Sequence, residues 1–193
     1  MPTDLGWAAL EWTGTEHVIA SSDAAGFRAD SQLILAEQEL VRVGYRLECD
    51  AGWRLTGLTI SLAAAGTDRT LVLAADGAGR WRAGGRPLPA LDGCIDVDID
   101  CTPLTNTLPI RRLAWSPGTS RDLDIAYVSV PGLTVRPARQ RYTLLERDEA
   151  RGTARYRYES GSFRADLLVD ADGFVIDYPG LWRRIGAGPE VPA

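Results

Sequence analysis

Residues 91–113 read LDGCIDVDIDCTPLTNTLPIRRL, and this stretch begins as a strand and ends as a helix. Apolar and acidic residues alternate from Ile95 to Asp100, which places three β-branched side chains on one strand face and three carboxylates on the other. Thr102-Pro103 interrupts the alternation, because proline removes a backbone donor. The stretch therefore predicts a strand followed at once by an element of another kind.

That second element is a short helix over residues 106–113. The hydroxyl and amide oxygens of residues 105–107 are N-cap acceptors, and Pro109 is tolerated because first-turn amides have no partner within the helix. Its apolar side chains are Leu108, Ile110 and Leu113. A helix of about two turns is unstable alone, so we expect it to be held by burial against a larger sheet.

The rest of the chain has the pattern of that sheet. Residues 41–49 alternate with apolar side chains at odd positions, and Asp50-Ala51-Gly52 ends the run with a turn. Similar runs and turns recur to a last strand over 181–185, with a first strand over 10–19. Residues 32–40 have the composition of a helix, but we favour a strand. The pattern predicts one mainly β domain over 1–193, an open roll or a barrel, with 186–193 as a frayed tail.

Composition excludes several classes of function. The net charge of −5 gives no basic footprint for nucleic acid. All 21 basic residues are arginine, so Schiff-base lysine chemistry and a P-loop are excluded. The beginning of the chain resembles no signal peptide and no apolar run is long enough to span a bilayer, so we expect a cytoplasmic protein without a membrane span.

The cysteines and the histidine give little support for a metal or cofactor. Cys49, Cys94 and Cys101 are odd in number and lack CxxC spacing, which indicates reduced, buried thiols. His17 is the only histidine, so any Ser-His-Asp or Cys-His scheme must use it, and no nucleophile elbow lies near it. We therefore assign no catalytic residue, metal ligand or cofactor.

The acidic row Asp96, Asp98 and Asp100 leaves an enzymatic alternative open. Its carboxylates lie about 7 Å apart along a strand and could hold a divalent cation or act as the acid and base of a hydrolase. His17 is the other candidate catalytic residue of such a hydrolase. The favoured interpretation is a solvated strand face paired with arginines of neighbouring strands.

Arginine and tryptophan side chains are the better ligand-binding candidates. A buried helix that carries Arg111 and Arg112 must pair them with carboxylates or present them to a ligand. Six tryptophans supply large apolar faces, although core packing is the favoured explanation for any single one of them. The candidate binding residues are Arg111, Arg112, Trp53, Trp81, Trp115, Asp96 and Asp98.

These residues also carry a family resemblance that covers nearly the whole chain. The matching positions are Leu91-Asp92-Gly93-Cys94, Asp96, Asp98, Thr102-Pro103 and Thr105 through Leu113, with Tyr45-Arg46, Gly79, Trp81, Tyr127-Val128, Pro131, Gln140, Tyr142, Tyr156-Arg157-Tyr158, Val169-Asp170, Gly173 and Asp177-Tyr178-Pro179 through Trp182. In these positions the chain resembles the bacterial putative glycolipid-binding family, formerly a domain of unknown function.

The resemblance implies a spiral β-roll, a long antiparallel sheet wound around one short α-helix. It also implies a non-catalytic protein that binds a glycolipid or another amphiphile, and it brings no catalytic residues. A hydrolase-like enzyme is the first alternative, and a homo-oligomeric interaction scaffold without a small ligand, such as a homodimer, is the second.

Overall fold

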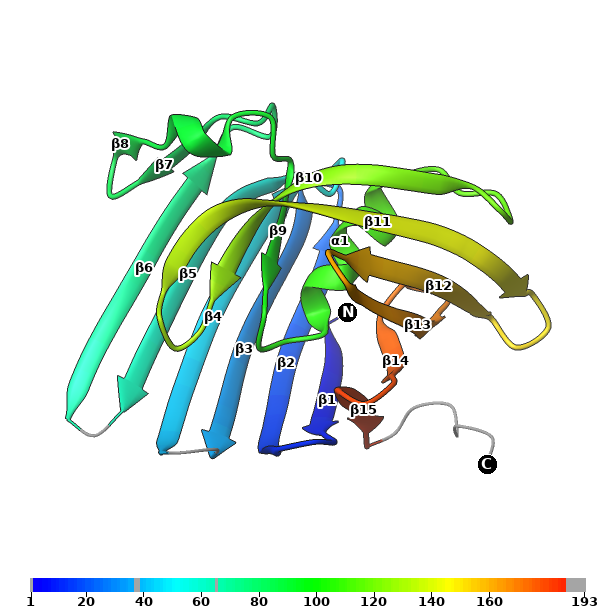
Figure 1. The fold of residues 1–193 in the computed structure, drawn as a ribbon, viewed down its shortest axis with the longest axis horizontal. Coiled ribbons are helices and arrows are strands. Elements are labelled where there is room, and N and C mark those ends of the chain that lie inside the picture. Colours follow the sequence, from blue (N-terminus) through cyan, green and yellow to red (C-terminus); the bar gives the residue numbers. More distant parts are fainter. Residues whose placement is uncertain (1, 37–38, 65, 187–193) are drawn as a thin grey trace.

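A computed structural model describes residues 2–36, 39–64 and 66–186 of the chain (Figure 1). Within these residues it contains 15 strands, two 3-10 turns and one α-helix. The elements are β1 (Thr3–Ala9), β2 (Thr13–Asp23), β3 (Gly26–Ala36), β4 (Leu40–Asp50), β5 (Leu55–Ala64), β6 (Thr67–Ala75), β7 (Trp81–Ala83), β8 (Arg86–Pro87), η1 (Pro89–Leu91), β9 (Asp96–Ile99), η2 (Leu104–Asn106), α1 (Thr107–Arg112), β10 (Ser120–Ser129), β11 (Thr134–Asp148), β12 (Thr153–Ser160), β13 (Phe163–Asp170), β14 (Val175–Tyr178) and β15 (Trp182–Ile185).

All the described strands belong to one open sheet, in the order β8-β7-β6-β5-β4-β3-β2-β1-β15-β14-β13-β12-β11-β10-β9. Among them, only β9 and β10 are parallel neighbours; the other pairs are antiparallel. The last strand lies beside the first, with Gly6 opposite Ile185. The two halves of the chain therefore run outward from this junction in opposite directions, and β8 and β9 form the two free edges.

The sheet is rolled so that its distant halves face each other across α1 (Figure 1). The Arg69 side chain on β6 donates hydrogen bonds to the carbonyls of Pro131 and Gly132 in the β10–β11 turn, at 2.5 and 3.4 Å. The mainly β fold, one sheet wound around a single short helix, is as predicted. It confirms the spiral β-roll.

Alternation along the strands explains which face of the sheet is buried. In β4 the predicted odd positions, among them Val43, Tyr45 and Leu47, are all buried. Trp7, Trp81 and Trp182 are at most 1% exposed, so half of the tryptophans serve the core. The cysteine prediction is also confirmed, because all three thiols are free and buried.

The helix α1 is enclosed as expected. Thr107 and Leu108 are fully buried and Ile110 is 7% exposed. The predicted capping is wrong, because η2 directly precedes α1 and continues its helical backbone. Asn106 instead donates to the carbonyl of Pro103 and accepts from the Tyr142 hydroxyl, so it ties the helix start to β11.

The predicted first strand is wrong in its position. The structure places β1 at Thr3–Ala9 and starts β2 at Thr13, with Leu10 exposed between them. Leu5 and Trp7 are buried, but the outward Gly6 and Ala8 gave β1 no clear polar alternation. Within the predicted 32–40, residues 32–36 belong to strand β3 (Gly26–Ala36), as favoured over a helix. Residues 37–38 lie outside the described residues, and Leu40 begins β4.

The ends of the chain complete this picture. The last strand, β15, agrees with the predicted 181–185, and the proposed frayed tail beyond Gly186 lies outside the described residues. The single α-helix of the described residues, α1, has six residues. No helix of the described residues is long and apolar enough to cross a membrane.

Candidate functional site

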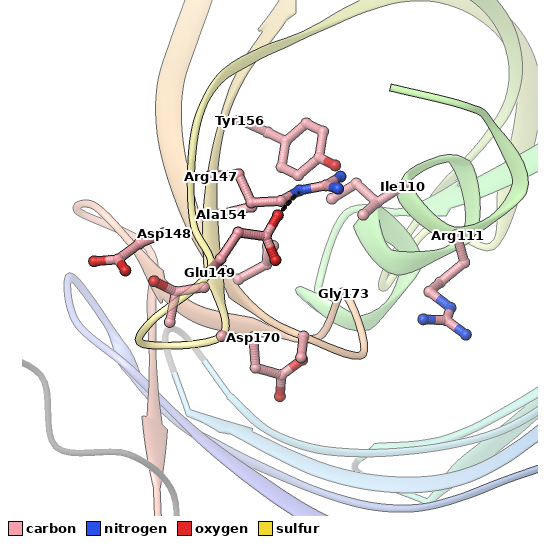
Figure 2. Close-up of a pocket in the computed structure, with 13 residues that line it drawn as sticks. Ile110, Arg111, Arg147, Asp148, Glu149, Ala154, Tyr156, Asp170 and Gly173 are labelled. Carbon is pink, nitrogen blue, oxygen red and sulfur yellow. Dashed lines mark ion pairs between the residues drawn. The ribbon is translucent and has the colours of Figure 1, made fainter. Parts of the chain in front are cut away.

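α1 and core side chains occupy the concave side of the roll, and the cavities lie at the two ends of α1 and beside the part of β1 that extends beyond its pairing with β15. The first, the helix-end pocket, has a volume of about 310 Å³ and lies where α1 ends. Figure 2 shows Tyr156, Arg147 and Glu149 on one side of it and Arg111 on the other. Arg147 and Glu149 form an ion pair at 3.9 Å. The pocket thus combines charged side chains with the apolar surface of Ile110 and its neighbours.

Arg111 is the free cation of this pocket. Its guanidinium lies 5.1 Å from the ring centroid of Trp53, which is stacked on Phe27 at 4.4 Å. Arg111 is exposed and forms no ion pair with the described residues. A guanidinium held over an aromatic ring keeps donors for a polar ligand. The structure thus brings together Arg111 and Trp53, two of the predicted binding residues.

Two further cavities continue from the helix-end pocket. The bridging pocket, about 120 Å³, is lined by Arg111, Trp53 and Phe174 among others. The sheet-edge pocket is the largest described, about 850 Å³, and shares Phe174 with the bridging pocket. Asp170 lines both the sheet-edge and the helix-end pockets. The three cavities therefore lie side by side around the β13–β14 turn.

The sheet-edge pocket combines apolar side chains with a buried arginine. Leu5, Phe174 and Ile185 supply its apolar lining, where β1 extends beyond its pairing with β15. Arg184 lines the same pocket with a side chain only 8% exposed, donating Nη1 to Asp170 at 2.6 Å. Its buried Nη2 has no hydrogen-bond partner among the described residues. A buried donor without a partner is destabilising. This nitrogen is closed off from the surface, so other atoms of Arg184 border the pocket.

The β13–β14 turn is held against α1 by Gly173. This residue has φ +81°, a conformation that favours glycine. A Cβ there would lie 3.1 Å from Ile110 Cγ2 and 3.2 Å from Arg111 Cδ. Asp170 fixes the turn by accepting from the amides of Asp172 and Phe174. Close approach at Gly173 therefore brings the three cavities next to the end of the helix.

Two of the predicted binding tryptophans, Trp115 and Trp81, hydrogen-bond to backbone carbonyls. Trp115 donates its indole N–H to the carbonyl of Ile110 at 3.0 Å and packs edge-on against Tyr156, so it supports the wall of the helix-end pocket. Trp81 donates to the carbonyl of Cys94 at 2.7 Å inside the core. Trp81 lines none of the cavities named here.

Arg112 and Asp96 form a buried ion pair. Arg112 Nε lies 2.9 Å from Asp96 Oδ1, and Nη2 lies 2.5 Å from Oδ2. The Asp96 side chain is 1% exposed. Burial raises its pKa, and the hydrogen bonds and charge of Arg112 oppose the rise. Pairing with a carboxylate, one of the two expected roles of the helix arginines, is confirmed for Arg112, and this pair joins α1 to β9.

The solvated-face interpretation of the acidic row is wrong for Asp96 and Asp98. Both sides of β9 are covered: Val97 and Ile99 lie in the core, and the carboxylates on the other side are covered by side chains of α1, η2 and β11. Asp98 accepts from Gln140 at 2.6 Å and from Thr105 at 3.0 Å. Burial raises the pKa of both Asp98 and Asp100, and neutral hydrogen-bond donors oppose the rise. These two carboxylates line another cavity, the carboxylate pocket, about 280 Å³, next to the residues that precede α1.

Glu16 is a buried carboxyl that sequence reasoning missed. It is 2% exposed, and it accepts from Ser31 and Tyr45 at 2.7 Å and from Thr102 at 2.6 Å. Burial raises its pKa to about 7, against the effect of these three hydrogen bonds. Thr102 begins the segment that leads to α1, so Glu16 connects this segment to three strands of the sheet.

The structure places His17 beside Asp4 at the surface and buries the three thiols. His17 has a side chain 57% exposed on β2, with Nε2 2.7 Å from Asp4 Oδ1. Burial raises the pKa of the Cys94 thiol to about 11, and it raises that of Cys49 and Cys101 as well. Buried neutral thiols are weak nucleophiles. Among the described residues no three His, Cys, Asp or Glu side chains are grouped as metal ligands.

Comparison with known proteins gives two matches. A family model described as "Putative glycolipid-binding" matches residues 4–184. A crystal structure of a DUF1089 family protein from Pseudomonas aeruginosa is 40% identical, with a TM-score of 0.81 over 89% of this chain and 92% of that chain. No curated protein matches the chain.

Proposed function

The chain belongs to the family described as "Putative glycolipid-binding", and from this membership we propose that it binds a glycolipid or a similar amphiphile without catalysis. The apolar chain of the ligand lies in the sheet-edge pocket against Leu5, Phe174 and Ile185. Its polar head extends through the bridging pocket toward Arg111.

The change in chemistry along three adjoining cavities is the observation that carries the proposal. The surface of the large sheet-edge cavity is mostly apolar, although charged side chains such as Asp172 and Arg184 also lie at it. The surface of the helix-end cavity is more polar, and its charged side chains are Arg111, Arg147, Asp148, Glu149 and Asp170. An amphiphile has the same two parts. Most of the binding free energy would come from its chain, at about 0.8 kcal/mol for each buried CH₂.

Arg111 supplies donors for the polar part. It faces the helix-end and bridging pockets, and it can donate to sugar hydroxyls or to a phosphate. Asp170 and Asp172 are acceptors for hydroxyl groups on the same side, which favours a sugar over a purely anionic head.

The first prediction uses alkyl glucosides below their critical micelle concentrations, titrated while tryptophan fluorescence and the melting temperature are recorded. Octyl and decyl glucoside should bind and raise the melting temperature, because a ligand that prefers the folded state stabilises it. Each added CH₂ should strengthen binding by about fourfold, the equivalent of about 0.8 kcal/mol. Methyl glucoside, which has no chain, should bind far more weakly.

Matched variants locate the two parts of the ligand. Ile185→Thr should weaken decyl glucoside binding by about tenfold, while Arg111→Gln should weaken octyl and decyl glucoside alike. Val72→Thr is the control, because Val72 is 49% exposed and Ile185 47%, yet Val72 lines none of the named cavities. Binding that is independent of chain length, or equal losses for Ile185→Thr and Val72→Thr, would contradict the proposal.

A further inference from the structure

The carboxylate pocket lies at the opposite end of α1 from the helix-end pocket. Thr102 and Asn106, which precede the helix, line the former, whereas Ile110 and Arg111 line the latter. The two cavities share no lining residue, so the proposed amphiphile leaves the carboxylate pocket unused.

Three aromatic rings form one side of this pocket. Tyr158, Phe163 and Tyr178 have centroids 6.0 to 6.2 Å apart, and all three line the cavity. Phe163 is 41% exposed, so part of its ring is accessible at the cavity. A cation over the face of an aromatic ring is attracted by the quadrupole of that ring.

Two carboxylates without a cationic partner line the same cavity. Asp98 and Asp100 form no ion pair with the described residues, and their hydrogen bonds come from neutral groups. Asp100 accepts from the Val130 amide at 2.9 Å and faces the Tyr127 hydroxyl at 3.3 Å. By contrast, Asp96 on the same strand is neutralised by Arg112.

One cation of the protein already lies at this pocket. The Arg136 guanidinium is 4.5 Å from the ring centroid of Tyr127, and Arg136 lines the cavity. It forms no ion pair with a described carboxylate and is exposed. When both are ionised, Asp98 and Asp100 outnumber Arg136 by two charges to one. Burial raises the pKa of both carboxyls, and a bound cation would oppose that rise.

We propose that the carboxylate pocket is a second binding site, which takes a small organic cation with an alkylammonium group. The ammonium group lies against Phe163 and Tyr158, where Asp98 and Asp100 supply the opposite charge. A sugar also suits aromatic and acidic side chains, but it leaves the two unpaired carboxylates without a counter-charge. The charge balance of the cavity therefore favours the cation.

Choline is the probe, titrated into the full-length protein by isothermal calorimetry. Its neutral isostere 3,3-dimethylbutanol has the same shape without the charge, and methyl glucoside represents a sugar. We expect choline to bind at least about tenfold more tightly than either neutral compound. Equal binding of choline and dimethylbutanol, tighter binding of methyl glucoside, or no binding of choline would overturn the proposal.

Variants with opposite expected effects separate this site from a general effect of charge. Asp98→Asn should weaken choline binding by about tenfold or more, and Phe163→Leu by about threefold. Arg136→Gln should strengthen it, because a competing positive charge is removed. Asp68→Asn, which removes an exposed carboxylate of β6, is the control and should leave binding unchanged.

Phe163→Leu and Arg136→Gln alter exposed side chains, so we expect both variants to fold. They test the site even if Asp98→Asn impairs folding. A weaker affinity in Arg136→Gln, or an unchanged affinity in Phe163→Leu, would contradict the assigned site. The alkyl glucoside titrations address other cavities, so either proposal can fail while the other stands.

Discussion

Arg112→Met should lower the free energy of unfolding by about 3–5 kcal/mol, because it leaves the buried Asp96 carboxylate without its partner. Asp96 is 1% exposed and receives two hydrogen bonds from Arg112. The double variant Asp96→Asn/Arg112→Met should lose less than the sum of the single variants, since it removes both charges. Urea denaturation of the four proteins measures this coupling.

The chain offers a control with the same chemistry at the surface. Arg141 makes two hydrogen bonds to Asp122, at 2.7 and 2.9 Å, and both side chains are about half exposed. Arg141→Met should therefore cost no more than about 1 kcal/mol. If Arg112→Met costs as little as Arg141→Met, the pair that joins α1 to β9 does not hold the helix in the roll.

Glu16→Gln should abolish a pH dependence of stability that is worth about 3 kcal/mol in the wild-type protein. Unfolded, Glu16 loses its proton near its ordinary pKa of 4.5, whereas in the folded protein it keeps the proton to about pH 7. Between these values the unfolded state binds fewer protons, so the free energy of unfolding falls as the pH rises. The stabilising contribution is complete below pH 4.5 and is lost above about pH 7.

Urea denaturation of both proteins at several pH values across this window tests the prediction. The amide that replaces the carboxyl in Glu16→Gln keeps an oxygen that can accept from Ser31 and Tyr45, so the variant should be the more stable protein above pH 7. Glu48→Gln is the control, because Glu48 lies on the exposed side of β4 with a side chain 42% exposed. Parallel pH profiles for wild type and Glu16→Gln would show that Glu16 stays ionised when buried.

Local patterns predicted most of the fold. The alternation of residues 41–49, the turn residues between strands and the inability of residues 106–113 to persist as a lone helix led to a sheet around a buried helix. The predictions of the N-cap and of the first strand were wrong, because both features depend on residues that are distant in sequence and close in space. Asn106 bonds Tyr142 on β11, and Gly6 lies opposite Ile185 at the far end of the chain.

The candidate site was predictable only in part, because it too depends on contacts between residues that are distant in sequence. Arg111 and Trp53 could be chosen by chemistry, and the fold brings them within 5.1 Å. Phe174, Arg184 and Ile185 looked like ordinary strand residues, because their cavity exists only where β15 lies beside β1. The acidic row suggested a solvated face, because nothing in its local sequence shows that Arg112, Thr105 and Gln140 cover its carboxylates.

Photo-crosslinking tests the proposed binding of an amphiphile most directly. A decyl glucoside with a diazirine at the end of its chain is irradiated with the protein, and mass spectrometry identifies the labelled peptides. We predict labelling at Leu5, Phe174 or Ile185, which line the sheet-edge pocket, and competition by unlabelled decyl glucoside. Labelling that is confined to other surfaces, such as Val72 of β6 or Phe163 at the carboxylate pocket, or that resists competition, would contradict the account.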